Sequence, residues 1–346
     1  MDTNRKQNQR PSRLSDIAAL AGVSRITVSK ALLGTGGANS RMSEATRKKI
    51  LKIAATVNYR PNMAARMLTG RRSGVIGVLV DSQAPTVCFE CLRHMEKAAA
   101  AKGYRLMIAQ QHEDVDSIFE YAMDFSAYGA EGLISFAHGY PALKEQIAEF
   151  MRVMPNVVYI GKPDFKDAAS VEVDTESGIR ALMEHLIKNG RKRIGIFLAN
   201  PENRTIKRRY DGYVSSLRAA GMEVDERLIL IDEAFKHENA GNVRRIIDTL
   251  VANGKADAIV AQNDLFAALI IGALAKRGCL VPADLAVTGF DDSAFAEAFN
   301  PPLTTVRQPM ERLANEAVNM LHEMITGNSP GSALSIKPEL ILRGSA

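Results

Sequence analysis

Polar side chains follow three apolar runs of this sequence, in places where a buried core would continue with apolar residues. Asp81, Asn263 and Asp291 each stand directly behind such a run, and Arg209 lies near the start of a separate helical stretch. Carboxylate, amide and guanidinium groups donate or accept hydrogen bonds in fixed directions. If the fold brings them together, they suit a ligand that carries several hydroxyls or a carboxylate.

Two cysteines have the spacing of a metal or redox motif. Cys88 and Cys91 form a C-x-x-C pair, and His94 follows one helical turn later. A zinc site or a redox centre needs a second pair or a thioredoxin-like context, and the sequence contains neither. We therefore expect thiols that behave as small hydrophobic side chains, with no metal site.

The motifs of the common enzyme classes are missing from the sequence. It has no phosphate-binding Walker motif, no nucleophile elbow, no H-E-x-x-H and no dinucleotide fingerprint, and its six histidines show no paired spacing. We expect no catalytic site and no cofactor. A binding protein or a regulator is the favoured class.

The overall composition is that of a globular protein with more than one domain. The chain has 346 residues, of which 46% are hydrophobic and 24% are charged. No apolar run approaches the roughly 20 residues needed to span a bilayer, and the first 13 residues have no signal-peptide pattern. The expected location is the cytoplasm.

Positive charge is concentrated in the first fifth of the chain. Residues 1–72 contain fifteen Lys and Arg against three acidic residues, a net charge of +12, whereas the whole chain carries +5. The remaining residues therefore carry −7. A basic segment ahead of an acidic body is typical of a module that binds a polyanion, with nucleic acid as the first candidate and an anionic membrane as the second.

The basic segment has helical periodicity rather than the pattern of a disordered tail. Apolar residues recur from Leu14 to Ala21, Gly22 ends that stretch, and Ser24 is a good N-cap for a second short helix. A third helix is expected from Ser43. Two short helices joined by a turn that contains Gly predict a helix-turn-helix over residues 13–59, behind a disordered basic tail at 1–12.

Several motifs in this region closely resemble the DNA-binding domain of the LacI/GalR family of bacterial regulators. They are Ile17-Ala18, Ala21-Gly22-Val23-Ser24, Thr27-Val28-Ser29-Lys30 and Asn58-Tyr59-Arg60-Pro61-Asn62. The resemblance extends into the core and covers nearly the whole chain from about residue 13. One departure is the loop from Leu33 to Met42, which is a few residues longer than the family's usual loop.

The resemblance implies a set of DNA contacts. Arg25, Ile26 and Lys30 match base-reading positions: a guanidinium can bond a guanine edge bidentately, and an isoleucine can contact a thymine methyl. Contacts to phosphates are expected from Ser24, Thr27, Ser29 and Asn39. For any one of these residues, the alternative is an ordinary solvated helix face.

Residues 60–72 are expected to form a hinge between the helical unit and the rest of the chain. A helix of about two turns fits Asn62 to Leu68, although such a segment is marginal alone in water. In the family, the matching segment orders on DNA and inserts a leucine into the minor groove. The resemblance therefore adds Asn62, Ala65 and Leu68 to the predicted DNA contacts.

From residue 73 onward, apolar strand-like runs alternate with amphipathic helical stretches. This alternation predicts an α/β core of parallel sheets covered by helices on both faces, in two doubly wound lobes. It resembles the periplasmic-binding-protein fold that the family uses. We expect the chain to cross between the lobes near Glu172, Arg307 and Gly327. The N-lobe then comprises about 73–171 and 307–327, and the C-lobe about 172–306 and 328–346.

In open α/β sheets, ligands bind beyond the carboxyl ends of the strands, which here means the cleft between the lobes. The resemblance assigns Arg209, Asn263 and Asp291 as effector contacts, and Asp81 lies at a matching strand end. For Asp291 the alternative is the cap of a turn, and capping explains the neighbouring Asp264 and Asp292 equally well.

The sequence therefore predicts a regulator, most simply a repressor, that binds a pseudo-palindromic DNA operator as a homodimer. A sugar or sugar derivative is the expected small-molecule effector. We expect a dimer rather than a tetramer, because the chain ends at Leu342-Arg343-Gly344-Ser345-Ala346 without the C-terminal leucine-rich helix of the family's tetramers. The alternatives are a non-sugar ligand, a protein corepressor, or a solute-binding protein, which would need export and would not carry residues 13–72.

Overall fold

The computed structural model describes residues 13–33, 42–59, 72–81, 84–111, 115–136, 154, 156–163, 168–199, 204–328 and 332–346. The chain divides into two compact units, Met1–Ser73 and Gly74–Ala346. None of the described helices is both long and apolar enough to cross a membrane.

The first unit is a bundle of three short helices: α1 (Leu14–Ala21), α2 (Arg25–Leu33) and α3 (Glu44–Thr56). Gly22 ends α1 in the left-handed conformation, with φ 69°, where a glycine has no Cβ to strain. The Ser24 hydroxyl accepts a bond from the Thr27 N–H at 3.1 Å, which confirms Ser24 as the N-cap of α2. Ile17, Val28 and Ile50, one from each helix, are fully buried at the centre of the bundle.

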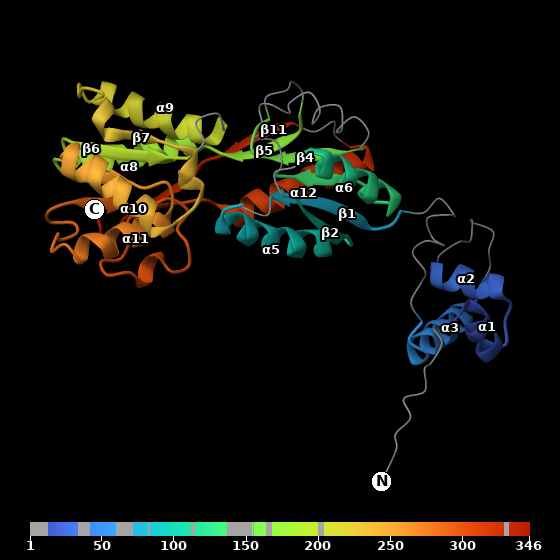
Figure 1. Cartoon of the computed structure of the whole chain (residues 1–346). Helices are drawn as coiled ribbons and strands as arrows, with labels where there is room; N and C mark the ends of the chain where they lie inside the picture. Colours follow the sequence, from blue (N-terminus) through green and yellow to red (C-terminus); the bar gives the residue numbers. More distant parts are fainter. Residues whose placement is uncertain are drawn as a thin grey trace, which may run out of the picture. The chain divides into compact units, whose positions relative to one another are not determined.

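The N-lobe of the second unit contains a six-stranded parallel sheet with the order β11-β5-β4-β3-β1-β2. Its strands are β1 (Val75–Asp81), β2 (Arg105–Gln111), β3 (Leu133–Ser135), β4 (Val157–Ile160), β5 (Ser170–Val173) and β11 (Ala333–Ile336). Helices α5 (Thr86–Ala101) and α12 (Met310–Thr326) pack on one face of this sheet, and α6 (Val115–Ala127) covers the other. These layers can be followed in Figure 1.

The C-lobe contains a four-stranded parallel sheet with the order β7-β6-β8-β9. Its strands are β6 (Ile194–Leu198), β7 (Ile229–Ile231), β8 (Ala258–Val260) and β9 (Ala286–Thr288). Helices α8 (Thr175–Lys188) and α9 (Arg204–Ala219) pack on one face, and α10 (Ala240–Ile246) and α11 (Asp264–Ala275) on the other. Short helical turns at Glu226–Leu228, Glu233–Lys236, Ile247–Asn253 and Ala296–Ala298 complete the lobe.

An antiparallel pair, β10 (Thr305–Arg307) with β12 (Glu339–Ile341), joins the C-lobe through Val306 and Leu340. The predicted fold class, a helix-turn-helix followed by a two-lobed parallel α/β core, is confirmed. Two of the predicted crossings also lie where the chain changes lobe, because β5 ends at Val173 before α8, and β10 ends at Arg307 before α12.

The third crossing lies about ten residues later than the sequence predicts. Residues 333–336 form β11, which pairs in parallel with β5 of the N-lobe sheet. The chain therefore crosses at Lys337 and Pro338, rather than near Gly327, and only β12 and the residues after it return to the C-lobe. Gly327 is instead the left-handed C-cap of α12, with φ 77°.

Candidate functional site

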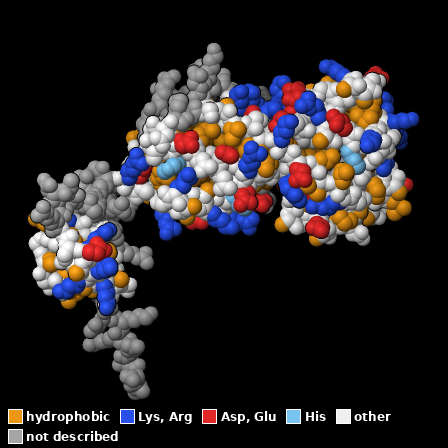
Figure 2. All heavy atoms as spheres, turned by 180° about the vertical axis from the view of Figure 1, so that it is seen from behind, with side chains coloured by type: hydrophobic (Ala, Val, Ile, Leu, Met, Phe, Trp, Pro, Cys, Tyr) orange, Lys and Arg blue, Asp and Glu red, His pale blue; other side chains and the backbone are white. Residues whose placement is uncertain are grey.

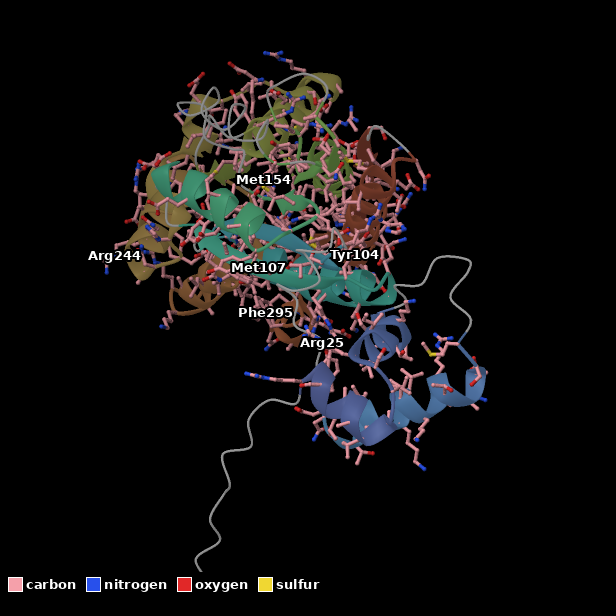
Figure 3. The ribbon with its side chains drawn as sticks, turned by 90° about the vertical axis from the view of Figure 1, so that its right-hand side faces the viewer. Arg25, Tyr104, Met107, Met154, Arg244 and Phe295 are labelled. Carbon is pink, nitrogen blue, oxygen red and sulfur yellow. The ribbon has the colours of Figure 1, made fainter. Side chains whose placement is uncertain are left out.

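The outward face of α2 carries exposed side chains at its start. Arg25 is exposed, and Ile26 has 68% of its surface exposed although it is apolar, while Val28 and Ala31 of the same helix are buried. Thr27, Ser29 and Lys30 are half-buried. Figure 3 labels Arg25 on this helix. A helix that presents Arg and Ile side by side can make both a hydrogen-bonded and a methyl contact to base edges.

Basic side chains gather on the helical unit, as the visible face in Figure 2 shows. Arg47, Lys48 and Lys52 of α3 are exposed. Lys49 has a structural role, because its Nζ donates to the Ala21 carbonyl oxygen at 3.0 Å and so caps the end of α1. Of the remaining predicted DNA contacts, Asn39, Asn62, Ala65 and Leu68 lie outside the described residues.

In the core, Arg209 on α9 is a buried cation with 7% of its surface exposed. Its guanidinium carbon lies 3.7 Å from the centre of the Phe290 ring, and one terminal nitrogen donates to the Gln262 carbonyl oxygen at 2.7 Å. The buried Nε has no hydrogen-bond partner among the described residues. Burial lowers the pKa of this guanidinium, and the carboxylates of Asp291 and Asp264 oppose that shift. An unsatisfied buried donor is what a bound ligand would relieve.

Asp291 follows β9 in a strained backbone conformation, with φ 120°, and Asp292 behind it has φ 54°. The Asp291 carboxylate accepts a bond from Gln308 Nε2 at 2.6 Å. Burial raises the pKa of Asp291 to about 7; the charges of Asp264 and Glu238 add to this rise, whereas Arg209 and the Gln308 bond oppose it. Strain and a perturbed carboxyl in one place are typical of a functional site.

Asn263 has two roles at the start of α11. Its side-chain oxygen accepts from the Phe266 N–H at 2.9 Å and caps the helix, and its Nδ2 donates to Glu238 Oε1 at 2.8 Å. Glu238 and Gln308 are not among the residues that the sequence predicts for this site. A signal was present for Glu238, because it precedes α10 at the same carboxyl edge of the sheet as Asn263 and Asp291.

Asp81 ends β1 in the N-lobe. Burial raises the pKa of the Cys88 thiol to about 12, and the charges of Asp291 and Asp81 add to the rise, so that Cys88 on α5 lies under the influence of both carboxylates. Cys88 is therefore near both Asp81, the predicted effector contact of the N-lobe, and Asp291, a predicted contact of the C-lobe. Cys91 is fully buried and packs in the N-lobe core. Among the described residues, no group of His, Cys, Asp or Glu could hold a metal ion.

The two remaining acidic residues of the region hold the fold together. Asp264 is fully buried and accepts from the Ser293 N–H at 2.6 Å and the Thr305 hydroxyl at 2.5 Å. Asp292 pairs with Arg307 at 2.7 Å and with Arg343 at 2.8 Å. Both carboxylates therefore have partners within the protein, which supports a structural role. Asp264 does not cap α11, because Asn263 is the N-cap of that helix.

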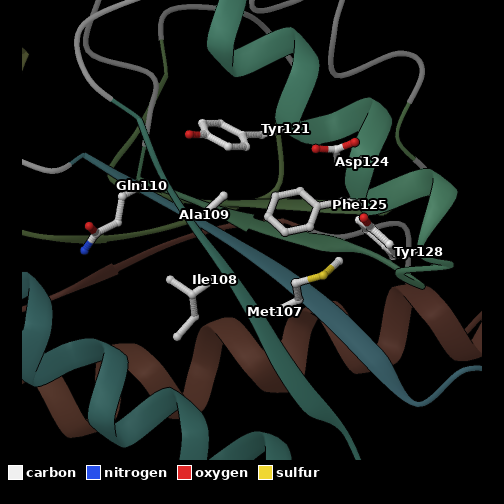
Figure 4. A pocket seen from close by; sticks show the side chains of 8 residues that line it. All are labelled: Met107, Ile108, Ala109, Gln110, Tyr121, Asp124, Phe125 and Tyr128. Atoms are coloured by element: carbon white, nitrogen blue, oxygen red, sulfur yellow. The ribbon is translucent and has the colours of Figure 1, made fainter.

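A separate hollow of about 520 Å³ lies between β2 and α6. Figure 4 shows its lining, which includes Met107, Ile108, Tyr121 and Phe125, with Asp124 at the side. None of the predicted effector contacts lines it. A second hollow of about 740 Å³ is lined by residues 187, 190–193 and 222–228, ahead of β6 and β7. Neither hollow contains the polar cluster described above.

Two family models match the chain. Residues 13–62 match "Bacterial regulatory proteins, lacI family", and residues 183–346 match "Periplasmic binding protein-like domain". The chain is 28% identical to the transcriptional repressor PurR of Photobacterium profundum, over 96% of this chain and 98% of that one. It is 29% identical to the transcriptional regulator CelR of Thermobifida fusca, over 98% and 99%.

Solved structures agree with these matches. The lac repressor dimer bound to operator and the anti-inducer ONPF superposes with a TM-score of 0.83 at 23% identity, covering 97% of this chain and 99% of that one. A CelR–cellobiose complex gives a TM-score of 0.71 at 26% identity, covering 97% and 100%. The named relatives are regulators rather than enzymes.

Proposed function

Because the chain belongs to the lacI family of bacterial regulatory proteins, a family of DNA-binding transcriptional repressors with a ligand-binding core, we propose a division of labour between its two units. The helical unit reads an operator through α2, and the polar cluster around Arg209 and Asp291 binds a small effector. Acting on DNA, the protein works in the cytoplasm as a homodimer on a pseudo-palindromic site, like the lac repressor dimer it resembles in fold.

The exposed start of α2 carries the DNA-reading proposal. Arg25 is exposed next to an exposed isoleucine, on a helix whose other face is locked into the bundle core. In this proposal, Arg25, Ile26 and Lys30 contact bases, and Ser24, Thr27 and Ser29 contact phosphates. Asn39, Asn62, Ala65 and Leu68 remain contacts proposed from the sequence.

Replacing Arg25 tests this reading directly. We expect Arg25→Ala to weaken binding to an operator selected from random DNA by roughly 1–3 kcal/mol and to relax the preference at one base pair. Lys48→Ala is the matched control, since Lys48 is an exposed cation on α3. Fluorescence anisotropy on selected and scrambled duplexes measures both. Equal losses for Arg25→Ala on the two duplexes would mean that Arg25 contacts only phosphate.

The effector proposal rests on the buried Nε of Arg209, which has no hydrogen-bond partner within the described part of the chain. A ligand oxygen bound there would give the buried guanidinium a further partner, beside the Phe290 ring and the Gln262 carbonyl oxygen that contact it within the described part of the chain. Asp291, Asn263 and Asp81 supply further acceptors and donors from both lobes. Cellobiose bound to CelR makes a sugar a reasonable class for this chain as well.

Removing Arg209 separates the two activities. We expect Arg209→Ala to abolish the effector-dependent change in operator affinity and to leave ligand-free operator binding within about twofold, because α2 and Arg209 belong to separate folded units. Anisotropy with and without effector gives both values. A variant that still responds to effector would place the ligand elsewhere.

A further inference from the structure

Gln262 is a half-buried amide at the carboxyl edge of the C-lobe sheet. It stands two residues behind β8, immediately before Asn263, the N-cap of α11. β6 lies beside β8 in the sheet, and β7 lies on the far side of β6. The segments that follow these three parallel strands therefore leave the sheet at the same edge, where ligands of such sheets bind.

The side-chain amide of Gln262 joins two of these segments. Its Oε1 accepts a hydrogen bond from the N–H of Ala199, directly behind β6, and its Nε2 donates to the carbonyl oxygen of Phe235 at 3.2 Å. Phe235 belongs to the short turn Glu233–Lys236 behind β7. An N–H needs an acceptor and a carbonyl oxygen needs a donor, so only one orientation of the amide satisfies both partners.

The main chain of the same residue holds Arg209. The Gln262 carbonyl oxygen accepts from an Arg209 terminal nitrogen at 2.7 Å, and the guanidinium stacks on the Phe290 ring. Ala199 and Phe235 pack in the core cluster of α10 and α11, whereas Phe290 packs in the cluster of α8 and α9. Gln262 therefore links partners that belong to opposite faces of the sheet.

The chain is also held on either side of Gln262. The N–H groups of Ala261 and Asp264 donate to main-chain carbonyl oxygens in and behind β9, at 2.9 and 3.0 Å. Between these two points, a rotation of the peptide that follows Gln262 would turn its carbonyl away from Arg209. The amide side chain opposes this rotation, because its two partners are main-chain groups of separate segments.

The direction of this carbonyl matters to a ligand of Arg209. The guanidinium is more than nine-tenths buried, and its Nε has no partner within the described part of the chain. A guanidinium is planar and rigid, so the bond at one terminal nitrogen also restricts the direction of the Nε–H. A hydrogen bond weakens steeply when its angle departs from linear, so a small rotation of Arg209 costs ligand affinity.

We propose that Gln262 is the positioning residue of the effector site: its side-chain amide, bonded to Ala199 and Phe235, fixes the carbonyl that orients Arg209 toward a ligand oxygen. The inference rests on the effector role proposed above and adds the residue that links the segments behind β6 and β7 to that site. Ligand affinity then depends on a side chain whose own partners lie within the protein.

Two matched variants of the full-length protein test this role. Gln262→Met keeps the length of the side chain and removes both amide bonds. Asn242→Leu is the control on α10, since Asn242 is also half-buried, and its Nδ2 donates to the carbonyl oxygens of Ala234 at 2.6 Å and His237 at 2.8 Å. The control therefore removes two bonds to the same turn from another side. Thermal unfolding shows whether each variant is folded.

Crystal structures of the wild type and both variants measure the position of Arg209. We expect the distance from its terminal nitrogen to the carbonyl oxygen of residue 262 to stay near 2.7 Å in wild type and in Asn242→Leu. In Gln262→Met it should exceed about 3.5 Å, beyond hydrogen-bond range. Gln262→Asn keeps the amide but is one methylene shorter, and it should move Arg209 in the same way if Gln262→Met does not fold.

Calorimetric titration measures the effect on a ligand, with cellobiose, glucose, galactose, glucuronate and adenine as probes. For each probe that binds wild type, the dissociation constant should rise about tenfold in Gln262→Met, as expected when a hydrogen bond from a charged donor is lost. In Asn242→Leu it should change by less than about twofold, because the bonds of Gln262 remain.

The results separate this inference from the effector role itself. Arg209 in its wild-type place in Gln262→Met would overturn the positioning role, and a loss of affinity in that case would make Gln262 a direct ligand contact. Equal movement of Arg209 in Gln262→Met and Asn242→Leu would assign the effect to the whole turn. A panel in which no probe binds wild type would count against the effector role, whereas the position of Arg209 in the crystals would still decide the role of Gln262.

Discussion

Asp291 combines three features that bear on function. Its backbone has a φ of 120°, its carboxylate accepts from Gln308, and burial raises its pKa to about 7. Arg209 nearby keeps the rise from being larger. The strained backbone is held by the bond from its own N–H to the Val306 carbonyl oxygen at 2.8 Å, so strain in one element is offset by pairing with another.

The raised pKa of Asp291 makes the stability of the protein depend on pH in a defined direction. The unfolded pKa of an aspartate is about 4, and the folded pKa of Asp291 lies above it. Such a carboxyl contributes its full stabilisation at pH values below the unfolded pKa, and this stabilisation is lost as the pH rises through the folded pKa. We therefore expect the melting temperature of wild type to fall relative to that of Asp291→Asn between pH 5 and pH 8.

Thermal unfolding of both proteins at the two pH values measures this difference. Asp248→Asn, at a carboxylate with 54% of its side chain exposed, is the control and should show the same offset from wild type at both pH values. A constant offset for Asp291→Asn as well would mean that Asp291 stays ionised throughout this range.

At the scale of elements, the sequence predicts the strands that have long apolar runs, but it does not predict the short strand at the edge of the N-lobe sheet. The runs that became β1, β6 and β8 are buried on both faces, so their hydrophobicity alone identifies them. β11 is four residues long, and two of its four side chains are exposed. It becomes a strand because β5 offers a partner, which is a tertiary fact that the local sequence does not contain.

The same contrast applies to the candidate site. Asp81 and Asn263 could be chosen from the sequence because parallel strands bring their carboxyl ends to one edge. Gln308 could not, since it follows an antiparallel strand that pairs with β12, more than thirty residues later. Glu238 lies at the same edge of the sheet, but it precedes a short helix and does not end a strand, so its signal in the sequence is weaker. Their positions depend on how loops return to the sheet.

Gly289, at the end of β9, is required by the packing of α11 against this strand. A Cβ at this position would meet Asp264 Oδ1 and would lie 2.8 Å from Leu303 Cδ2. Asp264 cannot move aside, because Ser293 and Thr305 hold its two oxygens. Gly289→Ala should destabilise the fold by about 1–3 kcal/mol through overpacking.

Gly272 in α11 is a matched control, since nothing lies within 4 Å of a Cβ added there. Gly272→Ala should be neutral or stabilise the helix by up to about 1 kcal/mol. We expect the melting temperature to fall in Gly289→Ala and to rise or stay unchanged in Gly272→Ala. Thermal unfolding of the two variants measures both values. Equal shifts would mean that the α11–β9 contact relaxes around an added methyl group.

At the scale of the whole molecule, charge is divided between the two units. Residues 1–72 carry +12, and the rest of the chain carries −7. The division suits a protein whose first unit must approach a polyanion while its core stays away from it. It also means that the two binding reactions should respond differently to ions, because the DNA contacts lie at an exposed surface and Arg209 is buried.

Operator affinity should therefore fall steeply with salt, whereas effector affinity should not. If a bound dimer covers 6–10 phosphates, counterion release lowers affinity by about 10³–10⁵-fold between 50 and 200 mM salt. A neutral effector releases no condensed counterions, and the contacts of Arg209 and Asn263 are partly shielded from solvent, so its dissociation constant should change by less than about twofold. Anisotropy for operator and calorimetry for effector, both as salt series, give the two slopes.

A shallow slope for operator would imply that few of the fifteen basic residues of the first unit touch phosphate. A steep slope for effector would mean that the ligand is itself charged and bound near solvent, and it would contradict a neutral effector.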